Sequence, residues 1–286
     1  ICGTCGDMCP FLYIQPRGTM GKRKDLLIII PAYNEEKTIA GLLEKLELPE
    51  VSEIADVLVM NDASSDSTNE IVKERNHKVV KHVFNLGYGS GLQLGYKYAV
   101  RKGYDYVIQM DADGQHDICN IRRIYDELKT KDEHGNYPDI VMGSRFMEGS
   151  TEFPITLTKK IAWTWFQVLI KLFTGVKIVD PTTGLQGLNR RTFSFYSTYD
   201  HFDDKYPDAN ILTQMLLLGY QLRQIPAVMH IRETGESMHS GLKPFIYMFR
   251  MTFSVLAAWI REKILKMDVG KTYDLEKYPK QKKMGI

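Results

Sequence analysis

The sequence predicts an α/β protein with a doubly wound, mostly parallel sheet and helices on both faces. Short apolar runs alternate with segments of helical periodicity through the first half of the chain. The first run, Leu26–Ile30, is apolar at every position, which is typical of a central parallel strand buried on both faces. Polar loops with carboxylates follow several of the runs, as expected where ligands bind at the carboxyl ends of parallel strands.

The elements follow in order along the chain. The predicted strands are Leu26–Ile30, Val57–Met60, Lys78–Phe84, Tyr104–Met110, Ile140–Met142, Tyr220–Ile225 and Val228–Ile231. Helices are predicted from Ile39, with Asn34 as N-cap, and over Thr68–Arg75, Leu92–Lys102 and Ile118–Lys131. A glycine-rich loop, Gly87–Gly91, leads into the third of these helices. It could let backbone amides approach a ligand, or only make a tight turn.

The stretch Val107–Asp117 carries the clearest chemical signal. A buried strand runs into Asp111-Ala112-Asp113-Gly114-Gln115, and residues two apart can face one ligand. Two carboxylates side by side suit a hard divalent cation, Mg²⁺ or Mn²⁺, that bridges the phosphates of a nucleotide. The alternative is an Asp-rich turn in which Asp117 caps the next helix. The position after a strand of an α/β pattern favours the metal site.

Two more loops at the same predicted edge carry carboxylates, Glu35 after the first strand and Asp62 after the second. Carboxylates repel phosphates, so these side chains are better suited to hydrogen-bond a base or a ribose. After the fifth strand, Arg145 could make planar, bidentate contacts with a diphosphate, or could be a solvated loop residue. The loops after the first, second and fourth strands are therefore expected to form the ligand crevice at the carboxyl edge of the sheet.

Two later segments, Thr156–Phe173 and Leu242–Ile260, are amphipathic and contain all three tryptophans of the chain. Tryptophan together with lysine or arginine on such helices is typical of a protein that rests in a membrane interface. Alternatively, the two helices pack on each other and on the sheet. The basic residue Arg250 and the short apolar span argue against a helix that crosses the bilayer.

Composition and charge limit the remaining possibilities. A net charge of +2 over 286 residues argues against nucleic acid as the main partner. Cysteine usage in the body of the chain, where only Cys119 occurs, suits a reducing compartment. The predicted divisions are a disordered leader or cloning remnant at 1–20, a catalytic domain at 21–240, an amphipathic membrane-proximal helix at 241–266, and a flexible basic tail at 267–286.

Five motifs together resemble the inverting family 2 glycosyltransferases of the A-type fold, and within them the dolichyl- and polyprenyl-phosphate sugar synthases. The motifs are Pro31-Ala32-Tyr33-Asn34-Glu35, Asn61-Asp62-Ala63-Ser64-Ser65-Asp66, Asp111-Ala112-Asp113-Gly114-Gln115-His116, Gly143-Ser144-Arg145 and Arg232-Glu233-Thr234-Gly235-Glu236-Ser237. They occur in the order of the family, and the likeness runs from about Leu26 to Ile264.

The resemblance implies a role for each motif. The implied nucleotide-binding residues are Pro31, Ala32, Tyr33, Glu35, Asp62, Asp111, Ala112 and Ser237. The implied metal ligands are Asp111, Asp113 and Gln115. The implied catalytic residues are Asp113, Arg145, Asp208 and Arg232. Lys160 and Thr164 have the spacing with which this branch binds the lipid phosphate. The family loop often ends in Ser-Lys, whereas Ser237 is followed by Met238 and His239 here, so His239 replaces that contact or it is absent.

The expected activity is transfer of one sugar, with inversion, from a nucleotide-sugar donor to polyprenyl phosphate. The resemblance favours UDP-glucose or UDP-N-acetylglucosamine. The expected location is peripheral, on the cytoplasmic face of the cell membrane, held by the amphipathic helices or by a small membrane protein partner. One alternative acceptor is a saccharide hydroxyl in cell-surface polysaccharide synthesis, for which Asp208 would have to act as a base. The other alternative is a non-catalytic scaffold that binds sugar nucleotides.

Overall fold

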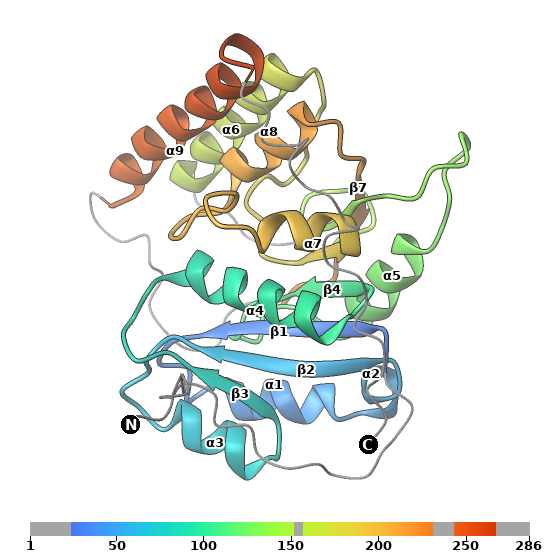
Figure 1. Cartoon of the computed structure of the whole chain (residues 1–286), viewed down its shortest axis with the longest axis vertical. Coiled ribbons are helices and arrows are strands. Elements are labelled where there is room, and N and C mark those ends of the chain that lie inside the picture. The colour runs from blue at the N-terminus through green and yellow to red at the C-terminus, as the bar shows by residue number, and fades with distance from the viewer. Residues whose placement is uncertain (1–23, 152–156, 231–242, 267–286) are drawn as a thin grey trace, which may run out of the picture.

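Seven strands form one mixed sheet through the residues that the structure, a computed structural model, describes: 24–151, 157–230 and 243–266 (Figure 1). The strand order is β3-β2-β1-β4-β6-β5-β7. The strands are β1 (Leu26–Ala32), β2 (Ala55–Asn61), β3 (Lys78–Lys81), β4 (Tyr106–Gln109), β5 (Ile140–Ser144), β6 (Gln186–Asn189) and β7 (Leu222–Pro226). The predicted parallel arrangement is confirmed for β3, β2, β1 and β4, and for the pair β5 and β7.

Helices cover both faces of this sheet, as predicted. Alternate residues of β1 face opposite sides, so Ile28 packs toward the helices α1, α2, α3 and α5, and Ile29 packs toward α4, α6, α7, α8 and α9. The helices are α1 (Ile39–Leu46), α2 (Pro49–Ser52), α3 (Thr68–Glu74), α4 (Tyr88–Lys102), α5 (Cys119–Leu128), α6 (Leu157–Thr174), α7 (Arg190–Tyr196), α8 (Ala209–Leu217) and α9 (Lys243–Trp259). A π-helical turn, Ile260–Ile264, extends α9.

Two strand predictions were wrong. Strand β6 was missed because Gln186–Asn189 has no apolar run; it lies antiparallel between β4 and β5. The predicted strand at Val228–Ile231 does not form in its described part. Only Met229 makes an isolated bridge, with His116, and Ile231 lies outside the described residues.

Helix starts also differ from the prediction. Asn34 does not cap α1; it has a positive φ of 55°, and its side chain accepts a hydrogen bond from the Ser65 amide at 2.9 Å. Helix α4 begins at Tyr88, so most of the predicted glycine loop is helical. A Cβ at Gly89 would lie 1.9 Å from the carbonyl oxygen of Asp203, which shows that this glycine permits a close backbone approach.

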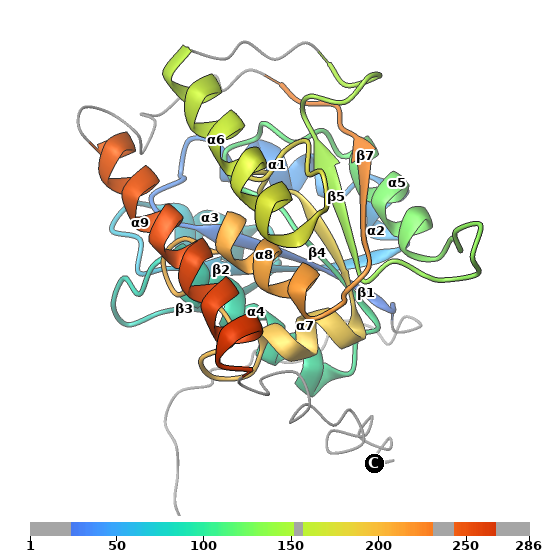
Figure 2. The same ribbon diagram turned by 90° about the horizontal axis from the view of Figure 1, so that it is seen from above.

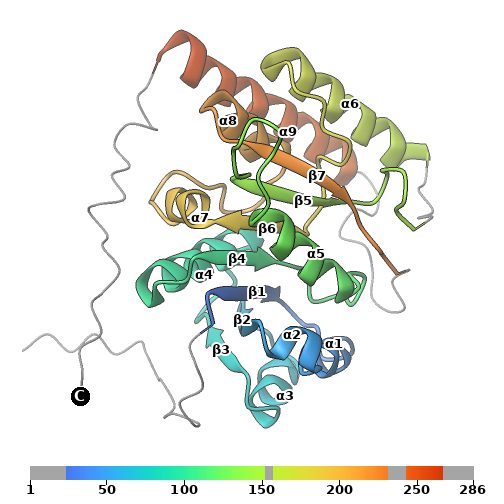
Figure 3. The same cartoon turned by 90° about the vertical axis from the view of Figure 1, so that its right-hand side faces the viewer.

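Helices α6 and α9 lie side by side at the end of the molecule away from β1, β2 and β3 (Figures 1 and 3). Trp165 on α6 donates a hydrogen bond to the Thr252 hydroxyl on α9 at 2.9 Å, and the rings of Phe173 and Trp259 lie 5.3 Å apart. Helix α8 lies against both of them, as the view from above shows (Figure 2). The predicted mutual packing of the two helices is therefore present.

The same pair of helices also exposes large apolar side chains. Seven of these side chains form what we call the apolar face: Ile161, Trp165, Val168 and Leu172 on α6, with Ile246, Phe249 and Phe253 on α9. Their exposed fractions range from 44% to 71%. Among the described residues, none of the helices is long and apolar enough to cross a membrane.

Candidate active site

The loops after β1 and β2 are joined at the carboxyl edge of the sheet. The amide of Glu35 donates to the Thr68 hydroxyl at 2.9 Å, and the Asp62 amide donates to the carbonyl oxygen of Ala32 at 2.9 Å. Pro31 and Ala32 end β1 and are buried, whereas half of Tyr33 is exposed. The structure therefore brings these predicted nucleoside residues to one edge, with the Tyr33 ring accessible there.

Asp62 is buried and accepts hydrogen bonds from three protein groups. The Nδ1 of His82 lies 2.7 Å from Asp62 Oδ1, and the amides of Leu86 and Gly87 each donate to this carboxylate at 2.8 Å. These bonds fix the turn that leads into α4. A direct contact between Asp62 and a nucleoside stays a prediction, since both carboxylate oxygens already accept bonds from the protein.

Asp111 lies two residues after the end of β4, with a third of its side chain exposed. The Tyr88 hydroxyl, at the start of α4, donates to Asp111 Oδ1 at 2.9 Å, and His116 Nε2 lies 3.4 Å from Oδ2. Burial favours the protonated carboxyl, but the hydrogen bonds from His116 and Tyr88 hold the pKa of Asp111 below its ordinary value. Asp111 is therefore ionised at neutral pH.

The turn after Asp111 is attached to the segment that follows β7. The His230 amide donates to the Gln115 carbonyl oxygen at 2.7 Å, and the Gln115 side-chain amide donates to the His230 carbonyl oxygen at 3.4 Å. Within the turn, the Gln115 amide donates to Asp113 Oδ1 at 3.1 Å. The predicted catalytic Arg232 and nucleotide-binding Ser237 come after His230 in the chain and lie outside the described residues.

The donor set of this turn fits a hard cation. Asp111 and Asp113 supply carboxylate oxygens and Gln115 an amide oxygen, which are the ligand types that Mg²⁺ and Mn²⁺ prefer. In the described part of the chain, no group of three or more His, Cys, Asp or Glu side chains is arranged to hold a metal alone. The residues present fit an ion that a ligand, such as a diphosphate, helps to coordinate.

Arg145 follows β5 and is held by Asp180, a carboxylate that no sequence motif indicates. Its Nε and Nη2 atoms donate to the two oxygens of Asp180, both at 2.7 Å, and Nη2 also donates to the Thr182 hydroxyl at 2.9 Å. Asp180 is fully buried. This bidentate pair fixes the plane of the guanidinium group while a fifth of the Arg145 side chain stays exposed.

The same segment also lies against Asp111. A Cβ at Gly184 would be 2.3 Å from Asp111 Oδ2, so only glycine allows this close approach. The run Asp180-Pro181-Thr182-Thr183-Gly184 has no periodicity, and its acidic residue is separated by 35 positions from the arginine that it orients. In the sequence this segment shows only a polar turn with one aspartate, and such a turn does not indicate which residue the aspartate binds.

Asp208 precedes α8 and accepts a hydrogen bond from the Tyr247 hydroxyl on α9 at 2.5 Å. Burial, together with the negative charges of Asp111 and Asp203, raises the pKa of Asp208 to about 6, although the Tyr247 bond and Arg145 oppose the rise. The charges of Asp111, Arg145 and Asp208 influence one another. The structure thus brings three predicted site residues together from the loops after β4 and β5 and before α8.

Comparison with known proteins shows the family to which these loops belong. A model of the family described as Glycosyl transferase family 2 matches residues 27–196, which is more than half of the chain. This chain belongs to glycosyl transferase family 2. The matched range includes the loops that carry Glu35, Asp62, Asp111, Asp113 and Arg145.

Several relatives of this family 2 chain are named for lipid-phosphate acceptors. An undecaprenyl-phosphate mannosyltransferase of Micrococcus luteus is 29% identical over 76% of this chain and 88% of its own length. A UDP-N-acetylglucosamine–dolichyl-phosphate N-acetylglucosaminyltransferase of Methanococcus voltae is 28% identical over 61% of this chain and 73% of its own length. The predicted resemblance to the dolichyl- and polyprenyl-phosphate branch is confirmed by these relatives.

The predicted A-type glycosyltransferase fold is also confirmed. The glucosyl-3-phosphoglycerate synthase of Mycobacterium tuberculosis, in a structure with Mn²⁺, UDP and glucosyl-3-phosphoglycerate, has a TM-score of 0.58 and 17% identity. The match covers 88% of this chain and 86% of the synthase. At this identity the likeness shows the fold alone.

Lys160 and Thr164, the predicted acceptor-phosphate residues of this family 2 protein, are both exposed on α6. The Thr164 hydroxyl donates to the backbone carbonyl oxygen of Lys160 at 2.9 Å, which places the two residues on successive turns of one helix side. Both lie on the helix that supplies four residues of the apolar face. Their role toward a phosphate stays a prediction.

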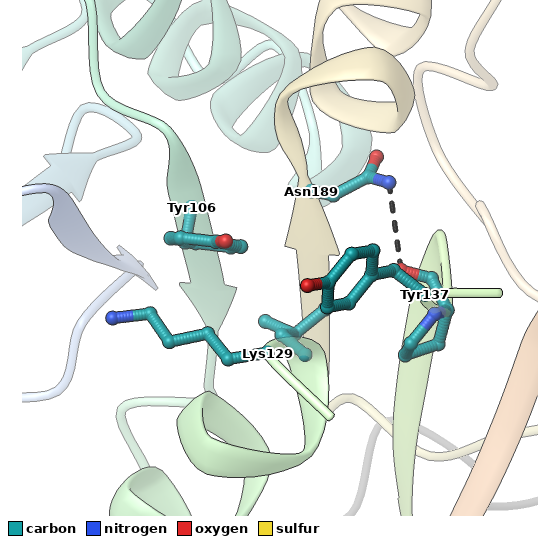
Figure 4. A pocket seen from close by; sticks show the side chains of 6 residues that line it. Tyr106, Lys129, Tyr137 and Asn189 are labelled. Carbon is teal, nitrogen blue, oxygen red and sulfur yellow. Dashed lines mark hydrogen bonds between the residues drawn. The ribbon is translucent and has the colours of Figure 1, made fainter. Parts of the chain in front are cut away.

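A cavity of about 330 Å³ lies at the opposite edge of the sheet from these carboxylates (Figure 4). Tyr106, the first residue of β4, and Asn189, the last of β6, line it together with Lys129 and Tyr137. The Lys129 ammonium lies 3.4 Å from an oxygen of Asp25 and 3.5 Å from the centre of the Tyr125 ring. These contacts account for the charge in the cavity, and the carboxyl edge stays the candidate site.

Proposed function

We propose that this protein transfers one sugar, with inversion, from a nucleotide-sugar donor to polyprenyl phosphate at a membrane surface, with a UDP-sugar such as UDP-glucose or UDP-N-acetylglucosamine as the favoured donor. The observation that carries the lipid acceptor is the apolar face of α6 and α9, next to the loop that holds Asp208. The names of the Micrococcus luteus and Methanococcus voltae relatives support the same acceptor class.

The apolar face has the composition of a surface that rests on anionic lipid. Neither α6 nor α9 contains an acidic residue, and the basic side chains of Lys160 and Arg250 are exposed. Burial of one large apolar side chain stabilises by about 1.5–3 kcal/mol, so a few of the seven suffice for reversible binding. We infer a peripheral position on the cytoplasmic face of the cell membrane. The free thiol of Cys119 suits that reducing compartment.

The donor would bind at the carboxyl edge of β1, β2 and β4. Tyr33 and Glu35 would contact the nucleoside, and Asp111, Asp113 and Gln115 would hold Mg²⁺ or Mn²⁺. A bound divalent cation would supply positive charge to the diphosphate leaving group. Arg145, held flat by Asp180, would direct its remaining guanidinium hydrogens at the donor phosphates or sugar. Arg232 and Ser237 would contact the same diphosphate.

The acceptor would attack the anomeric carbon from the side opposite the leaving group. A phosphate monoester has a second pKa near 6, so it is largely dianionic at neutral pH and needs no strong base. Lys160 and Thr164 would bind this phosphate at the start of α6. Asp208 would lie on the acceptor side of the cleft and accept any proton that the phosphate still carries.

A saccharide hydroxyl is the second candidate acceptor, and one observation favours it. The pKa of Asp208, about 6, is suited to a general base at neutral pH, which a hydroxyl acceptor requires and a dianionic phosphate does not.

One assay distinguishes the two acceptors. Radiolabelled UDP-sugar and Mn²⁺ are incubated with the protein and either vesicles that contain polyprenyl phosphate or a panel of oligosaccharides. We expect label in the lipid fraction. Label in the oligosaccharides alone would reject the lipid-phosphate function and leave the second candidate.

A further inference from the structure

Tyr247 connects the helix α9, which carries part of the apolar face, to Asp208. It lies on α9, directly after the exposed Ile246, and its hydroxyl donates to Asp208 Oδ2 at 2.5 Å. Its ring meets Phe166 of α6 edge-to-face at 5.8 Å and Tyr206 at 5.4 Å. Because rings from α6 and from the loop before α8 both contact it, the hydroxyl position is fixed.

A second hydrogen bond joins α9 to the first turn of α8, directly after the loop. The side-chain amide of Asn210 donates to the Ser254 hydroxyl on α9 at 3.0 Å and to Asp203 Oδ2 at 3.0 Å. The backbone before α8 in turn contacts the start of α4, where the Ser90 amide donates to the Asp204 carbonyl oxygen at 3.0 Å. Helix α9 is thus bonded to the loop that carries Asp208, and this loop is bonded to the helix that carries Tyr88.

The ionised Asp208 carboxylate needs a hydrogen-bond donor because its charged neighbours act on it in opposite directions. Asp111, from the loop after β4, and Asp203, from its own loop, repel the ionised carboxylate, whereas Arg145, after β5, attracts it. Burial also disfavours the charge. Without the Tyr247 hydroxyl, the carboxylate would lose the hydrogen bond that favours its charged form and fixes its orientation.

We propose that Tyr247 is a positioning residue that holds the Asp208 carboxylate toward the acceptor, so that the helix resting on the membrane and the reacting groups keep one fixed geometry. The inference rests on the proposed function, because it assumes transfer to an acceptor presented at the apolar face. Nothing in the family motifs selects Tyr247, which lies outside the range that the family model matches.

The test is Tyr247→Phe, which removes the hydroxyl and keeps the ring contacts. Loss of a hydrogen bond to a charged group corresponds to about a 10- to 100-fold effect. We expect kcat for transfer to polyprenyl phosphate in vesicles to fall by about that factor. The KM for the donor and the fraction of protein that floats with vesicles should stay within about twofold.

Thr252→Val is the matched control. It removes the hydrogen bond between Trp165 and α9 without touching Asp208, so it reports what a weaker contact between the two helices does by itself. We expect its kcat to stay near that of the unmodified protein.

Three outcomes decide between the ideas. If the unmodified protein transfers no sugar to polyprenyl phosphate, the proposed function fails before the variants are compared. If it does transfer and Tyr247→Phe keeps its kcat within twofold, the positioning role is overturned. The role is equally overturned if kcat and vesicle binding fall together and to the same extent in Tyr247→Phe and Thr252→Val, because a general packing defect would then explain both.

Discussion

The proposed donor side and the proposed acceptor side of the site hold their carboxylates in opposite ways. Asp111 accepts hydrogen bonds from Tyr88 and His116, which lower its pKa, whereas desolvation, followed by the negative charges of Asp111 and Asp203, raises the pKa of Asp208 to about 6. The surroundings differ as well, because the loops after β1 and β2 are joined by polar bonds, and the helices near Asp208 expose an apolar face. The difference suggests one side built for permanent negative charge and another for a carboxylate that can gain and lose a proton.

The largest expected effect comes from the donor side. Asp113→Ala should lower sugar transfer by at least about 10³-fold, because the turn loses one of its two carboxylates for the cation. Steady-state rates across a Mn²⁺ titration measure the effect. A non-catalytic scaffold would keep its cellular role with this substitution, so a complementation assay separates that alternative.

Asp126→Ala is the control for this substitution, since Asp126 is an exposed carboxylate on α5 that pairs only at the surface with Arg122, at 3.0 Å. It should leave transfer unchanged. Equal loss in both variants, or full activity of Asp113→Ala, would remove the basis for a metal at this turn.

The next effect tests whether Asp180 fixes Arg145. Asp180→Asn removes the ionised partner from a buried bidentate pair, so we expect about a 100-fold loss of kcat, together with a loss of about 3–5 kcal/mol of unfolding free energy. Rates are therefore compared per folded molecule, with unfolding followed by urea titration.

Asp139→Asn provides the matched control for stability. Asp139 is also buried, pairs with Arg191 at 3.1 Å, and lies just before β5, at the amino edge of the sheet. It should lose stability to a similar degree and keep its kcat. If both variants keep kcat once they are folded, Arg145 does not depend on Asp180.

The sequence predicts the first half of the molecule well and the second half less well, for a physical reason. Strand β1 is buried on both faces, so its apolar run appears directly in the sequence, and the Asp-x-Asp turn follows a run of the same kind at β4. Strand β6 and the pair of Arg145 with Asp180 depend on contacts between distant segments. Periodicity reports only on neighbouring residues, so it cannot show them.

Helices α6 and α9 show where a pattern is ambiguous. The aromatic stripes of α6 and α9 predicted either membrane contact or mutual packing, and the structure shows packing through Trp165 and Phe173 with exposed residues remaining. The width of an apolar stripe does not reveal how much of it a neighbouring helix covers. The exposed fractions of the residues in the apolar face, such as Phe249 and Phe253, identify the part that is open.

A smaller effect is expected at the apolar face. Phe249→Ser should weaken binding to vesicles of anionic lipid about tenfold, because 70% of this residue is exposed and its transfer into lipid would be lost. Flotation measures the binding, and isothermal titration with the donor and Mn²⁺ should show unchanged affinity. Tyr199→Ser, at an exposed aromatic residue outside the apolar face, is the control. Equal vesicle binding of all three proteins would contradict membrane contact through α9.

The smallest expected effect is on the pH dependence of the unfolding free energy, which should differ in sign between Asp208 and Asp111. The folded-state pKa of Asp208 is raised from 3.8 to about 6, so the folded protein binds more protons than the unfolded chain between these values. Its contribution to the unfolding free energy should therefore fall as the pH rises from about 4 to about 6, and stay constant above. In Asp208→Asn this loss should disappear, so the variant gains stability relative to the unmodified protein over that range.

Asp111 should behave with the opposite sign. Its folded-state pKa is lowered, so its stabilisation is present above the ordinary value of 3.8 and is lost only as the pH falls below it. Urea titrations of the unmodified protein, Asp208→Asn and Asp111→Asn between about pH 2 and about pH 7.5, on the order of ten points each, give both slopes. A constant difference between Asp208→Asn and the unmodified protein from pH 5 upward would mean that Asp208 titrates like an ordinary carboxyl, and the contrast between the two sides of the cleft would then be one of polarity alone.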